Sequence, residues 1–526
     1  MGLQTARVLD KQEHVELALE LLSFAGGENT ISEDQAMKTE EGRQVDNWDA
    51  LSLGGMIRAR GFNEVGDGGV GYTLQPDLLI QHKDSGGTEL YAVIEGDLVK
   101  FVGAVLTQDD AAAFTSGVLT HGVSAGEGLW MTNVSDGLKR KTVGVAIATP
   151  SSVPASNCAR IYGHKTRLIA EGSSDFPRRV YICRAGVGNW VASDAWSLSN
   201  DASSIDLPED TRGCQPNFPS GNETLVFTNR GGYAIYNFPN TAFRPLGNPF
   251  RNCCAPYSIA LGDEGVYFMS DWPTKGIFVY DGVNSPKELT YFNRDVFIDK
   301  IDLSKRVYGI YRNRRYYLIY SDIDSAVSYP NKMRIYDATL GRWMNRPVNT
   351  ALSDNFGYPA LLRFGFNNIY AASSQKDKCY ELETDDNSDE GQATQAVYKT
   401  KVFSSRDFAI ASGGEFGIDD VRLKLIKMIV TFHGTTGSVS VLWDMDRGLH
   451  SGTKTIDLTA AGALLNTTFI LNTSSITSTP QDRTVVYPFP NGAVGRRVQF
   501  TISNSGTSTR PRIKKIKIVA LALEEA

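Results

Sequence analysis

GVYFMSDWPTKGIFVYDG (residues 265–282) holds two aromatic-rich runs, which a Pro-containing turn separates and a Tyr-Asp pair ends. The same design returns in RRYYLIYSDIDSAVSYPNKMRIYDATLGRWM (residues 314–344) and, degenerately, in LVFTNRGGYAIYNF (residues 225–238). Each copy predicts a β-hairpin, because aromatic and β-branched runs bounded by Gly, Asn, Asp and Pro favour strands joined by turns. We expect Asp281 and Asp337 to close the turns after these strands by accepting hydrogen bonds from backbone amides.

Similar strand-like runs follow one another from about Tyr72 up to the acidic stretch ETDDNSDEGQATQ (residues 383–395). A unit of two to four antiparallel strands that repeats every 40 to 50 residues or so is typical of a β-propeller. An array of β-sandwiches also gives short strands between turns. The propeller is favoured because the pairs are aromatic on both strands and recur without a core-sized unit of their own. We predict an all-β protein with a propeller of about five to seven blades.

The character of the chain changes on either side of this region. We predict an N-terminal arm at residues 1–66, the propeller at 67–383, a polar linker at 384–395 and a β-sandwich at 396–526, where apolar and polar residues alternate. Residues 10–22 (DKQEHVELALELL) are a helix candidate, but their partial two-residue alternation also permits a strand.

Composition restricts the function. The 526 residues carry a formal net charge of −6 and six scattered cysteines, without CxxC spacing. This balance disfavours a specific DNA reader and a disulfide scaffold, and we expect buried thiols. The chain has no apolar run near the roughly 20 residues that cross a bilayer, and no basic-then-apolar signal peptide. We therefore expect no membrane segment.

The histidines and the basic clusters do not favour a metal site or a nucleic-acid site. The six histidines lie at no HxH or HxxxH spacing, so we expect no metal site. RNRRYY (residues 312–317) interleaves Arg and Tyr and could grip nucleic acid, but arginines at a hairpin turn before a strand are the favoured interpretation. We expect no cofactor and no enzymatic activity.

The N-terminal segment FAGGENTISEDQAMKTEEGRQVDNWDALSLGGMIRARGF (residues 24–62) resembles the start of a broad family of structural proteins of tailed bacteriophages. That family runs from an "sGG-N-T" turn through "ea-x-x-N" to "GgL-x-x-RpGf". The matching positions are Gly26, Gly27, Asn29, Asn47, Gly54, Gly55, Arg58, Arg60, Gly61 and Phe62. Ala59-Arg60 replaces the family's proline before the last glycine.

Two later stretches extend the resemblance. ARIYGHKTRLIAEGSSDFPRRVYICRAGVGNWVASDAWSL (residues 159–198) is similar to the family's "hkNRLfva…p.rvyyS.pGdp.nW", with Thr166 in place of Asn and Cys183-Arg184 in place of Ser. Residues 265–282 are similar to "GvfFls…GvyvydG". The order of these motifs carries the resemblance, which covers roughly residues 24–282.

The resemblance implies a virion protein of a tailed bacteriophage, of the short-tailed kind, that is made in the cytoplasm of the host bacterium. Its relatives are the tail nozzle or tail tubular protein B group and the DNA-stabilisation or head-closure proteins. The expected assembly is a homo-oligomeric, usually hexameric, ring in the tail nozzle or head-to-tail connector. It would contact tail adaptor or portal-proximal proteins and tail fibre or spike proteins, retain packaged double-stranded DNA, and pass it non-specifically during ejection. The alternative is a propeller-type tail component that binds or cleaves glycans.

Five residues are candidates for inter-subunit or arm contacts. Asn47, Arg58 and Arg60 belong to the N-terminal segment, where the arginines could pair with carboxylates of the same propeller or of a neighbour. Arg314 and Arg315 lie at the expected hairpin turn.

Overall fold

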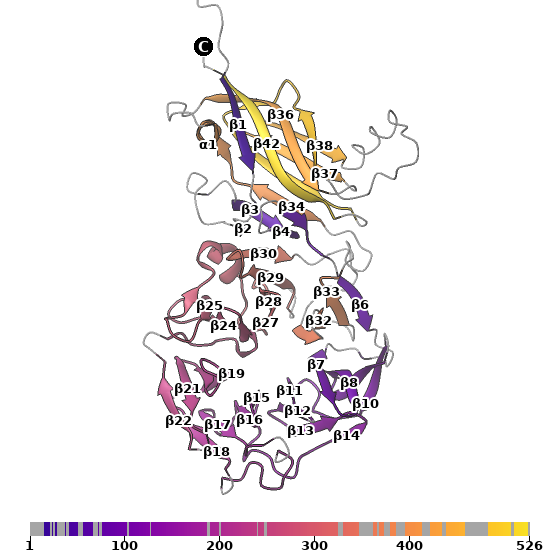
Figure 1. Ribbon diagram of the computed structural model, residues 1–526, viewed down its shortest axis with the longest axis vertical. Coiled ribbons are helices and arrows are strands. Elements are labelled where there is room, and N and C mark those ends of the chain that lie inside the picture. Colours follow the sequence, from indigo (N-terminus) through magenta and orange to yellow (C-terminus); the bar gives the residue numbers. More distant parts are fainter. Residues whose placement is uncertain are drawn as a thin grey trace, which may run out of the picture. The chain divides into compact units, whose positions relative to one another are not determined.

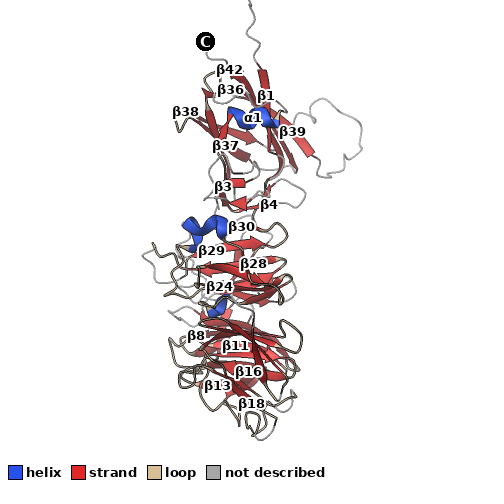
Figure 2. Ribbon diagram, turned by 90° about the vertical axis from the view of Figure 1, so that its left-hand side faces the viewer, coloured by secondary structure: helices blue, strands red, loops and turns tan. Residues whose placement is uncertain are grey.

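The computed structural model describes residues 15–21, 24, 27–28, 37, 41–50, 56–60, 62–66, 72, 76–102, 105–126, 128–186, 190–198, 201–238, 240–246, 250–324, 330–346, 361–364, 368–372, 379–384, 395–412, 421–433, 438–457, 482–506 and 510–523. Strands dominate both compact units of the chain (Figure 2). The sandwich unit combines residues 1–59 with 395–526, and the propeller unit holds residues 60–394.

The propeller unit consists of antiparallel four-stranded blades set around a centre (Figure 1). Six blades use four consecutive strands each. They are blade 1, β7 (Pro76–Asp84), β8 (Gly87–Ile94), β9 (Asp97–Val102) and β10 (Val105–Asp110); blade 2, β11 (His121–Ala125), β12 (Gly128–Asn133), β13 (Gly137–Thr142) and β14 (Val145–Ala148); blade 3, β15 (Arg160–His164), β16 (Arg167–Glu171), β17 (Arg179–Ile182) and β18 (Ser203–Asp206); blade 4, β19 (Thr211–Pro216), β20 (Thr224–Thr228), β21 (Gly232–Tyr236) and β22 (Ala242–Pro245); blade 5, β23 (Ala260–Gly262), β24 (Gly265–Ser270), β25 (Gly276–Tyr280) and β26 (Lys287–Glu288); and blade 6, β27 (Tyr308–Arg312), β28 (Arg315–Tyr320), β29 (Lys332–Asp337) and β30 (Arg342–Arg346). Short helical turns η2 (Pro256–Ser258), η3 (Tyr291–Asn293) and η4 (Arg294–Ile298) join some of them.

The seventh blade closes the ring with a strand from the beginning of the unit. β31 (Leu361–Phe364), β32 (Asn368–Ala372) and β33 (Cys379–Leu382) are completed by β6 (Phe62–Gly66), which pairs antiparallel with β33. The described residues thus form seven blades, within the predicted range of five to seven, and the propeller fold is confirmed.

Each blade packs its two faces on two different neighbours. In β28, Tyr316 and Leu318 belong to a core shared with blade 5, whereas Tyr317 and Ile319 belong to a core shared with blade 7. This division follows from the two-residue period of a strand, which sends successive side chains to opposite faces. Because both faces are buried, the middle strands read as nearly continuous apolar runs, which is why the aromatic hairpins stand out in the sequence.

The turn carboxylates act as the sequence predicted. Asp281 Oδ1 accepts hydrogen bonds from the amides of Val283 and Asn284, at 2.9 and 2.8 Å. Asp337 Oδ1 accepts the corresponding two amides at 3.0 and 3.1 Å. Each carboxylate therefore satisfies backbone donors that the strand has left unpaired.

The sandwich unit is built from both ends of the chain. One sheet has the order β39 (Asp482–Pro488), β36 (Arg422–His433), β42 (Arg512–Leu523), β5 (Met56–Arg58) and β4 (Trp48–Ala50), with β1 (Val15–Leu21) on β42 and β40 (Val494–Gly495) on β36. The facing strands run β38 (His450–Asp457), β37 (Ser438–Met445), β41 (Arg497–Asn504), β34 (Ala396–Thr400) and β3 (Glu41–Asp46), with β35 (Phe403–Ser404) on β41 and β2 (Gly27–Glu28) parallel to β3. Helix α1 (Ser405–Ala411) follows β35.

The predicted boundaries differ from these units. The segment expected as an arm, residues 1–66, contributes β1, β3, β4 and β5 to the sandwich unit and β6 to the propeller. The division falls after residue 59, and residues 385–394 of the expected linker lie outside the described residues. The reason is pairing: a strand needs a partner for its backbone groups, and these partners lie hundreds of residues away.

Residues 10–22 permitted a helix or a strand, and the described part of this segment is a strand. Val15–Leu21 is strand β1, and its alternate residues Leu17, Leu19 and Leu21 are at most 3% exposed. They join one core with residues of both sheets, among them Trp48 and Phe500.

Candidate functional site

The centre of the propeller contains a cavity of about 480 Å³, lined by the innermost strands of blades 1 to 6 and by η2. Four rings form a chain across this lining. His121 lies 5.1 Å from Tyr162 and 6.0 Å from Tyr257, and Tyr257 lies 5.7 Å from Tyr308, measured between ring centroids. These rings come from blades 2, 3 and 6 and from η2, so side chains rather than backbone shape the centre.

A buried ion pair supports one end of the ring chain. Arg160 binds Glu171 with its Nε and, at 2.9 Å, its Nη2, and Glu171 has no exposed surface. Tyr162 donates its hydroxyl to Glu171 Oε1 at 3.2 Å. Burial opposes ionisation of Glu171, but the Arg160 charge outweighs it and lowers the pKa of the carboxyl. The pair is therefore charged in the folded protein.

A second ion pair lies at the other end. Arg306 Nη1 donates to Asp77 Oδ1 at 2.9 Å and lies 3.4 Å from the Tyr308 hydroxyl. Burial raises the pKa of Asp77, although Arg306 opposes the rise. Both arginines beside the cavity are paired with carboxylates, and the lining residues themselves offer hydrogen-bonding groups and aromatic faces.

Three histidines link successive blades; His82 and His164 are buried, and His121 is partly buried. His82 of blade 1 contacts Ser124 of blade 2, the Nδ1 of His121 in blade 2 accepts the Ile161 amide of blade 3 at 3.3 Å, and His164 of blade 3 contacts Thr224 of blade 4 at 2.9 Å. Burial lowers the pKa of both His121 and His164 to about 4. They are neutral near pH 7, so each keeps an acceptor nitrogen for its neighbour.

His82 lies between a serine and a carboxylate. Its Nδ1 is 2.9 Å from Ser124 Oγ, and its Nε2 is 3.2 Å from Asp84 Oδ2. Burial disfavours the Asp84 charge, but amides of Val143 and Gly86, together with His82, outweigh this effect and lower its pKa. Ser124 is exposed, whereas His82 is fully buried. A serine, an imidazole and an ionised carboxylate are thus joined in one hydrogen-bonded line.

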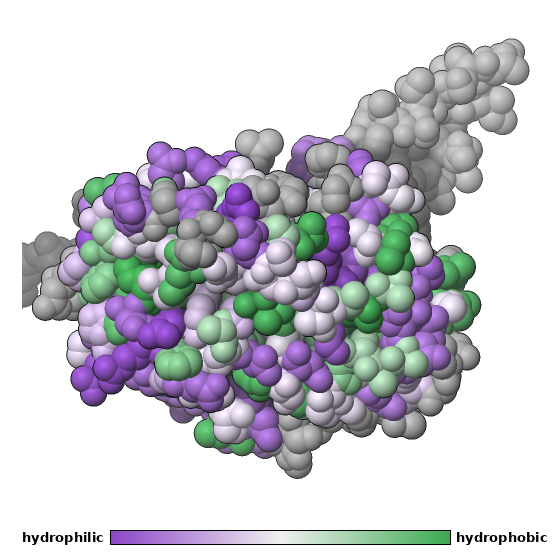
Figure 3. Space-filling model, turned by 90° about the horizontal axis from the view of Figure 1, so that it is seen from below, coloured by the Kyte–Doolittle hydropathy of each residue, from purple (hydrophilic) through white to green (hydrophobic). Residues whose placement is uncertain are grey.

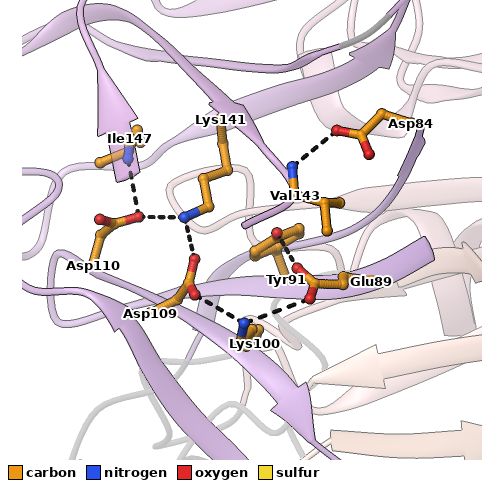
Figure 4. Close-up of polar contacts among 9 residues, drawn as sticks. All are labelled: Asp84, Glu89, Tyr91, Lys100, Asp109, Asp110, Lys141, Val143 and Ile147. Atoms are coloured by element: carbon orange, nitrogen blue, oxygen red, sulfur yellow. Dashed lines mark hydrogen bonds and ion pairs between the residues drawn. The ribbon is translucent and has the colours of Figure 1, made fainter. Parts of the chain in front are cut away.

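An ion network ties blades 1 and 2 together nearby (Figure 4). Lys141 of blade 2, 3% exposed, binds Asp109 and Asp110 of blade 1, the latter at 2.7 Å. Lys100 extends the network to Asp109 at 3.2 Å and to Glu89 at 3.5 Å. All acidic groups of this network face lysines, so its role is to hold the two blades together.

The candidate contact residues of the N-terminal segment are used within the chain. Asn47, 6% exposed, donates Nδ2 to the Gln395 carbonyl at 2.9 Å and has a φ of 52°. Arg58, 1% exposed, donates its Nη1 to the carbonyl of Gly506. Both therefore stabilise the sandwich unit, while Arg60 is exposed and donates to the Glu383 carbonyl at 3.4 Å.

The other two candidates, Arg314 and Arg315, lie in the propeller and differ in exposure. Arg315 binds Glu383 at 3.0 Å and Asp337 at 3.4 Å, and its side chain is 19% exposed. Arg314 lies in the turn between β27 and β28, where a hairpin turn was expected, with a φ of 60° and a side chain 65% exposed, 3.7 Å from Asp263. As inter-subunit contacts these residues remain predictions, and Arg314 and Arg60 are the accessible ones.

Sequence reasoning missed the central cluster and the Ser124 constellation. The cluster has no local signal, because its members come from different blades. Ser124 did have one: residues 122–126 read Gly-Val-Ser-Ala-Gly, the Gly-x-Ser-x-Gly spacing of a nucleophile elbow. Here residues 122–125 lie in strand β11 and Gly126 in the turn before β12, rather than at a strand-to-helix elbow.

The rest of the described surface and the cysteines show no further candidate site. On the face shown in Figure 3, hydrophobic residues form small groups among hydrophilic ones, which is typical of ordinary solvent-exposed surface. Within the described residues, no group of three His, Cys, Asp or Glu side chains is placed to hold a metal ion. No helix of that part of the chain is both long and apolar enough to span a membrane. Five of the six free cysteines are buried, and Cys254 is partly buried.

Comparison with known proteins gives only distant structural similarities. No family model and no curated protein matches the chain. Among solved structures, YCF48 bound to D1 peptide is similar over 65% of this chain and 98% of its own, with 8% identity and a TM-score of 0.37. The WD40 β-propeller domain of Doa1 is similar over 60% and 98%, with 12% identity and a TM-score of 0.38.

Proposed function

We propose that this chain is a structural virion protein of a tailed bacteriophage. In this proposal it forms a ring in the tail nozzle or the head-to-tail connection, retains packaged DNA and conducts it during ejection. The observation that carries the proposal is the ordered match of three segments, residues 24–62, 159–198 and 265–282, to the phage family pattern.

The matched segments hold structural positions in both units. Within residues 159–198 lie β15, β16 and β17 of blade 3, and residues 265–282 form β24 and β25 of blade 5. In the first segment, Asn47 takes the positive φ between β3 and β4, and Arg58 is buried in β5. The resemblance therefore follows fold-determining residues, as expected for a scaffold protein rather than for a shared active site.

The propeller has properties that suit a load-bearing wall. Seven apolar cores join successive blades around the whole circle, and buried ion pairs and histidines add polar links. The central cavity has the volume of a small-ligand pocket, far below that of a double helix. DNA would therefore pass between several copies, arranged by a head-to-tail interface that closes by rotation.

The acidic balance of the chain also fits a conduit. Each phosphate that a protein neutralises adds salt-dependent affinity through counterion release, which would slow the passage of DNA. A net charge of −6 works against such binding.

Imaging of the virion tail tests this proposal. We expect density for this chain in a ring around a central channel at the tail or neck, and ring particles or multimers in light scattering of the purified protein. Purified virions without this chain, as judged by mass spectrometry, would contradict it. A monomer in solution that is still present in the virion ring would mean that a partner ring is needed for assembly.

A second candidate function is glycan binding, and the central cavity favours it. Aromatic faces of Tyr257 and His121 beside the amide groups of Gln215 and Asn217 offer the stacking surfaces and neutral hydrogen bonds that a sugar ring can use. Calorimetric titration with host surface polysaccharide tests it. We expect binding that Gln215→Ala weakens; no heat from the phage's own host polysaccharide would contradict it.

A further inference from the structure

We propose that Ser124 is an activated nucleophile, that His82 is its general base, and that the pair hydrolyses carboxylic esters. This inference is independent of the proposed virion role. It rests on the geometry at the junction of blades 1 and 2, where β7 and β11 lie side by side as the innermost strands.

The order of donors and acceptors from Ser124 through His82 to Asp84 is the one that activation of a nucleophile needs. Asp84 Oδ2 faces the Nε2 of His82 at 3.2 Å, so the imidazole proton is held on Nε2. In this tautomer Nδ1 is the acceptor nitrogen, and it lies 2.9 Å from Ser124 Oγ. An imidazole that accepts from a serine and donates to a carboxylate has the same order of donors and acceptors as in serine hydrolases, with the roles of Nδ1 and Nε2 exchanged.

The carboxylate is fixed independently of the histidine. Asp84 Oδ2 also accepts the Val143 amide at 2.9 Å, and Oδ1 accepts the Gly86 amide at 2.8 Å. These amides belong to two different blades, so Asp84 is anchored before any substrate arrives. Such anchoring sets the orientation of the ring of His82, which is fully buried and closely packed.

The nucleophile is accessible although its base is not. In β11, Val123 and Ala125 pack toward the core shared by blades 2 and 3, and Ser124, on the opposite face, is exposed. Glycines flank the serine at 122 and 126, and Gly126 has a φ of 58°. Small neighbours leave room for an acyl group to approach the hydroxyl.

The reaction balances with water as the co-reactant. His82 Nδ1 takes the Ser124 proton while Oγ bonds to the ester carbonyl carbon, and the alcohol leaves with that proton as the carbon–oxygen bond breaks. Water, deprotonated by His82, then attacks the acyl-serine and releases the carboxylic acid and Ser124. Esters are the expected class because an alkoxide leaves more readily than an amine, which lowers the demand for additional stabilisation of the oxyanion.

The experiment uses the purified full chain. A fluorophosphonate probe is added and the labelled peptide is located by mass spectrometry, and p-nitrophenyl acetate hydrolysis is followed in parallel. We expect the label on Ser124, its loss in Ser124→Ala, and a fall in hydrolysis of at least about 100-fold. Ser116→Ala, which changes another exposed serine, is the matched control and should keep both signals.

Localisation of the label in the unmodified protein keeps the test independent of folding. The buried His82 is changed to Gln as a second variant, with its melting temperature measured; a folded variant that is labelled at the normal rate would overturn the role of His82. Absence of label from Ser124, or ester hydrolysis unchanged in Ser124→Ala, would overturn the proposal and leave the three residues as a clamp between blades. Neither result bears on the presence of the chain in virion tails.

Discussion

At the scale of residues, buried polar side chains contribute contacts between and within blades. Arg160 and Glu171 pair within blade 3, and His82 and His164 contact the next blade; all four side chains are buried. A buried charge without its partner is costly, because desolvation is no longer offset by attraction and hydrogen bonding. Such residues therefore make the junctions specific as well as tight.

Breaking the central ion pair should destabilise the propeller. We expect Glu171→Gln to lower the free energy of unfolding by about 3–5 kcal/mol, because it leaves the Arg160 guanidinium buried without a countercharge. Urea denaturation followed by tryptophan fluorescence measures it. Replacing both residues by apolar ones, Arg160→Met with Glu171→Leu, should cost less than the single change; a larger cost for the double variant would contradict this account.

Acid should weaken the junction at His121. Its pKa is about 4 in the folded protein, against about 6.5 in an unfolded chain, because of burial and the Arg160 charge. Between these values only the unfolded chain takes up the proton, so stability falls as the pH falls from 6.5 to 4 and then stops changing. The full loss is about 3 kcal/mol.

His121→Asn isolates this contribution, because the amide oxygen can replace Nδ1 as the acceptor of the Ile161 amide. Denaturation of both proteins at pH 7.5 and pH 4.5 provides the comparison. We expect the variant to lose about 2–3 kcal/mol less than the unmodified chain over this interval. Equal losses would mean that His121 does not titrate in the folded protein as described.

At the scale of elements, the hairpin that ends in Tyr-Asp is the repeated unit. Tyr280 and Tyr336 are buried in the cores between blades, and the aspartates that follow them fix the next turn. Two adjacent residues thus combine a packing role with a turn role. This combination explains why the pattern is readable in the sequence without any knowledge of the blades.

The Asp281 turn offers a prediction at this scale. Asp281→Ala removes the acceptor of two backbone amides and of Asn284 Nδ2 at 2.7 Å, and should cost about 1 kcal/mol. Asp281→Asn keeps an oxygen acceptor and should cost less. Thermal melting of both variants measures the difference; an Ala variant as stable as the Asn variant would show that the turn is fixed by its glycine instead.

At the scale of the whole molecule, the propeller depends on β6, which closes the ring of blades by pairing with β33. Asn63 and Glu64 of β6 are opposite Glu381 and Tyr380 of β33. Consecutive amides of a strand point to opposite sides, so one of these two must face β33.

Introducing proline at both positions, Asn63→Pro with Glu64→Pro, therefore removes at least one ladder hydrogen bond and clashes with the sheet. We expect a loss of about 3 kcal/mol or more and early proteolytic cleavage of blade 7. Alanine at both positions is the control and should leave the melting temperature nearly unchanged. A proline variant as stable as the alanine variant would contradict closure by β6.

The sequence by itself determined the local features: the strand-rich class, the aromatic hairpins, the turn aspartates, and the hairpin turn before β28. These depend on residues close together in the chain, so pattern and turn chemistry are enough to predict them. Tertiary structure alone decided the rest. Strand β1 finds β42 across almost the full length of the chain, Asn47 and Arg58 become buried supports, and β6 closes the ring.

The residues of the centre show the same limit most clearly. Arg160 and Glu171 are neighbours across one hairpin, yet their meeting with Tyr257 and His121 depends on how blades 2 and 3 and the turn η2 assemble. Even where the sequence held a signal, as at Gly-Val-Ser-Ala-Gly, only the neighbouring blade supplied His82 and Asp84. Chemistry of this kind depends on distances between side chains, and only the packed blades set those distances.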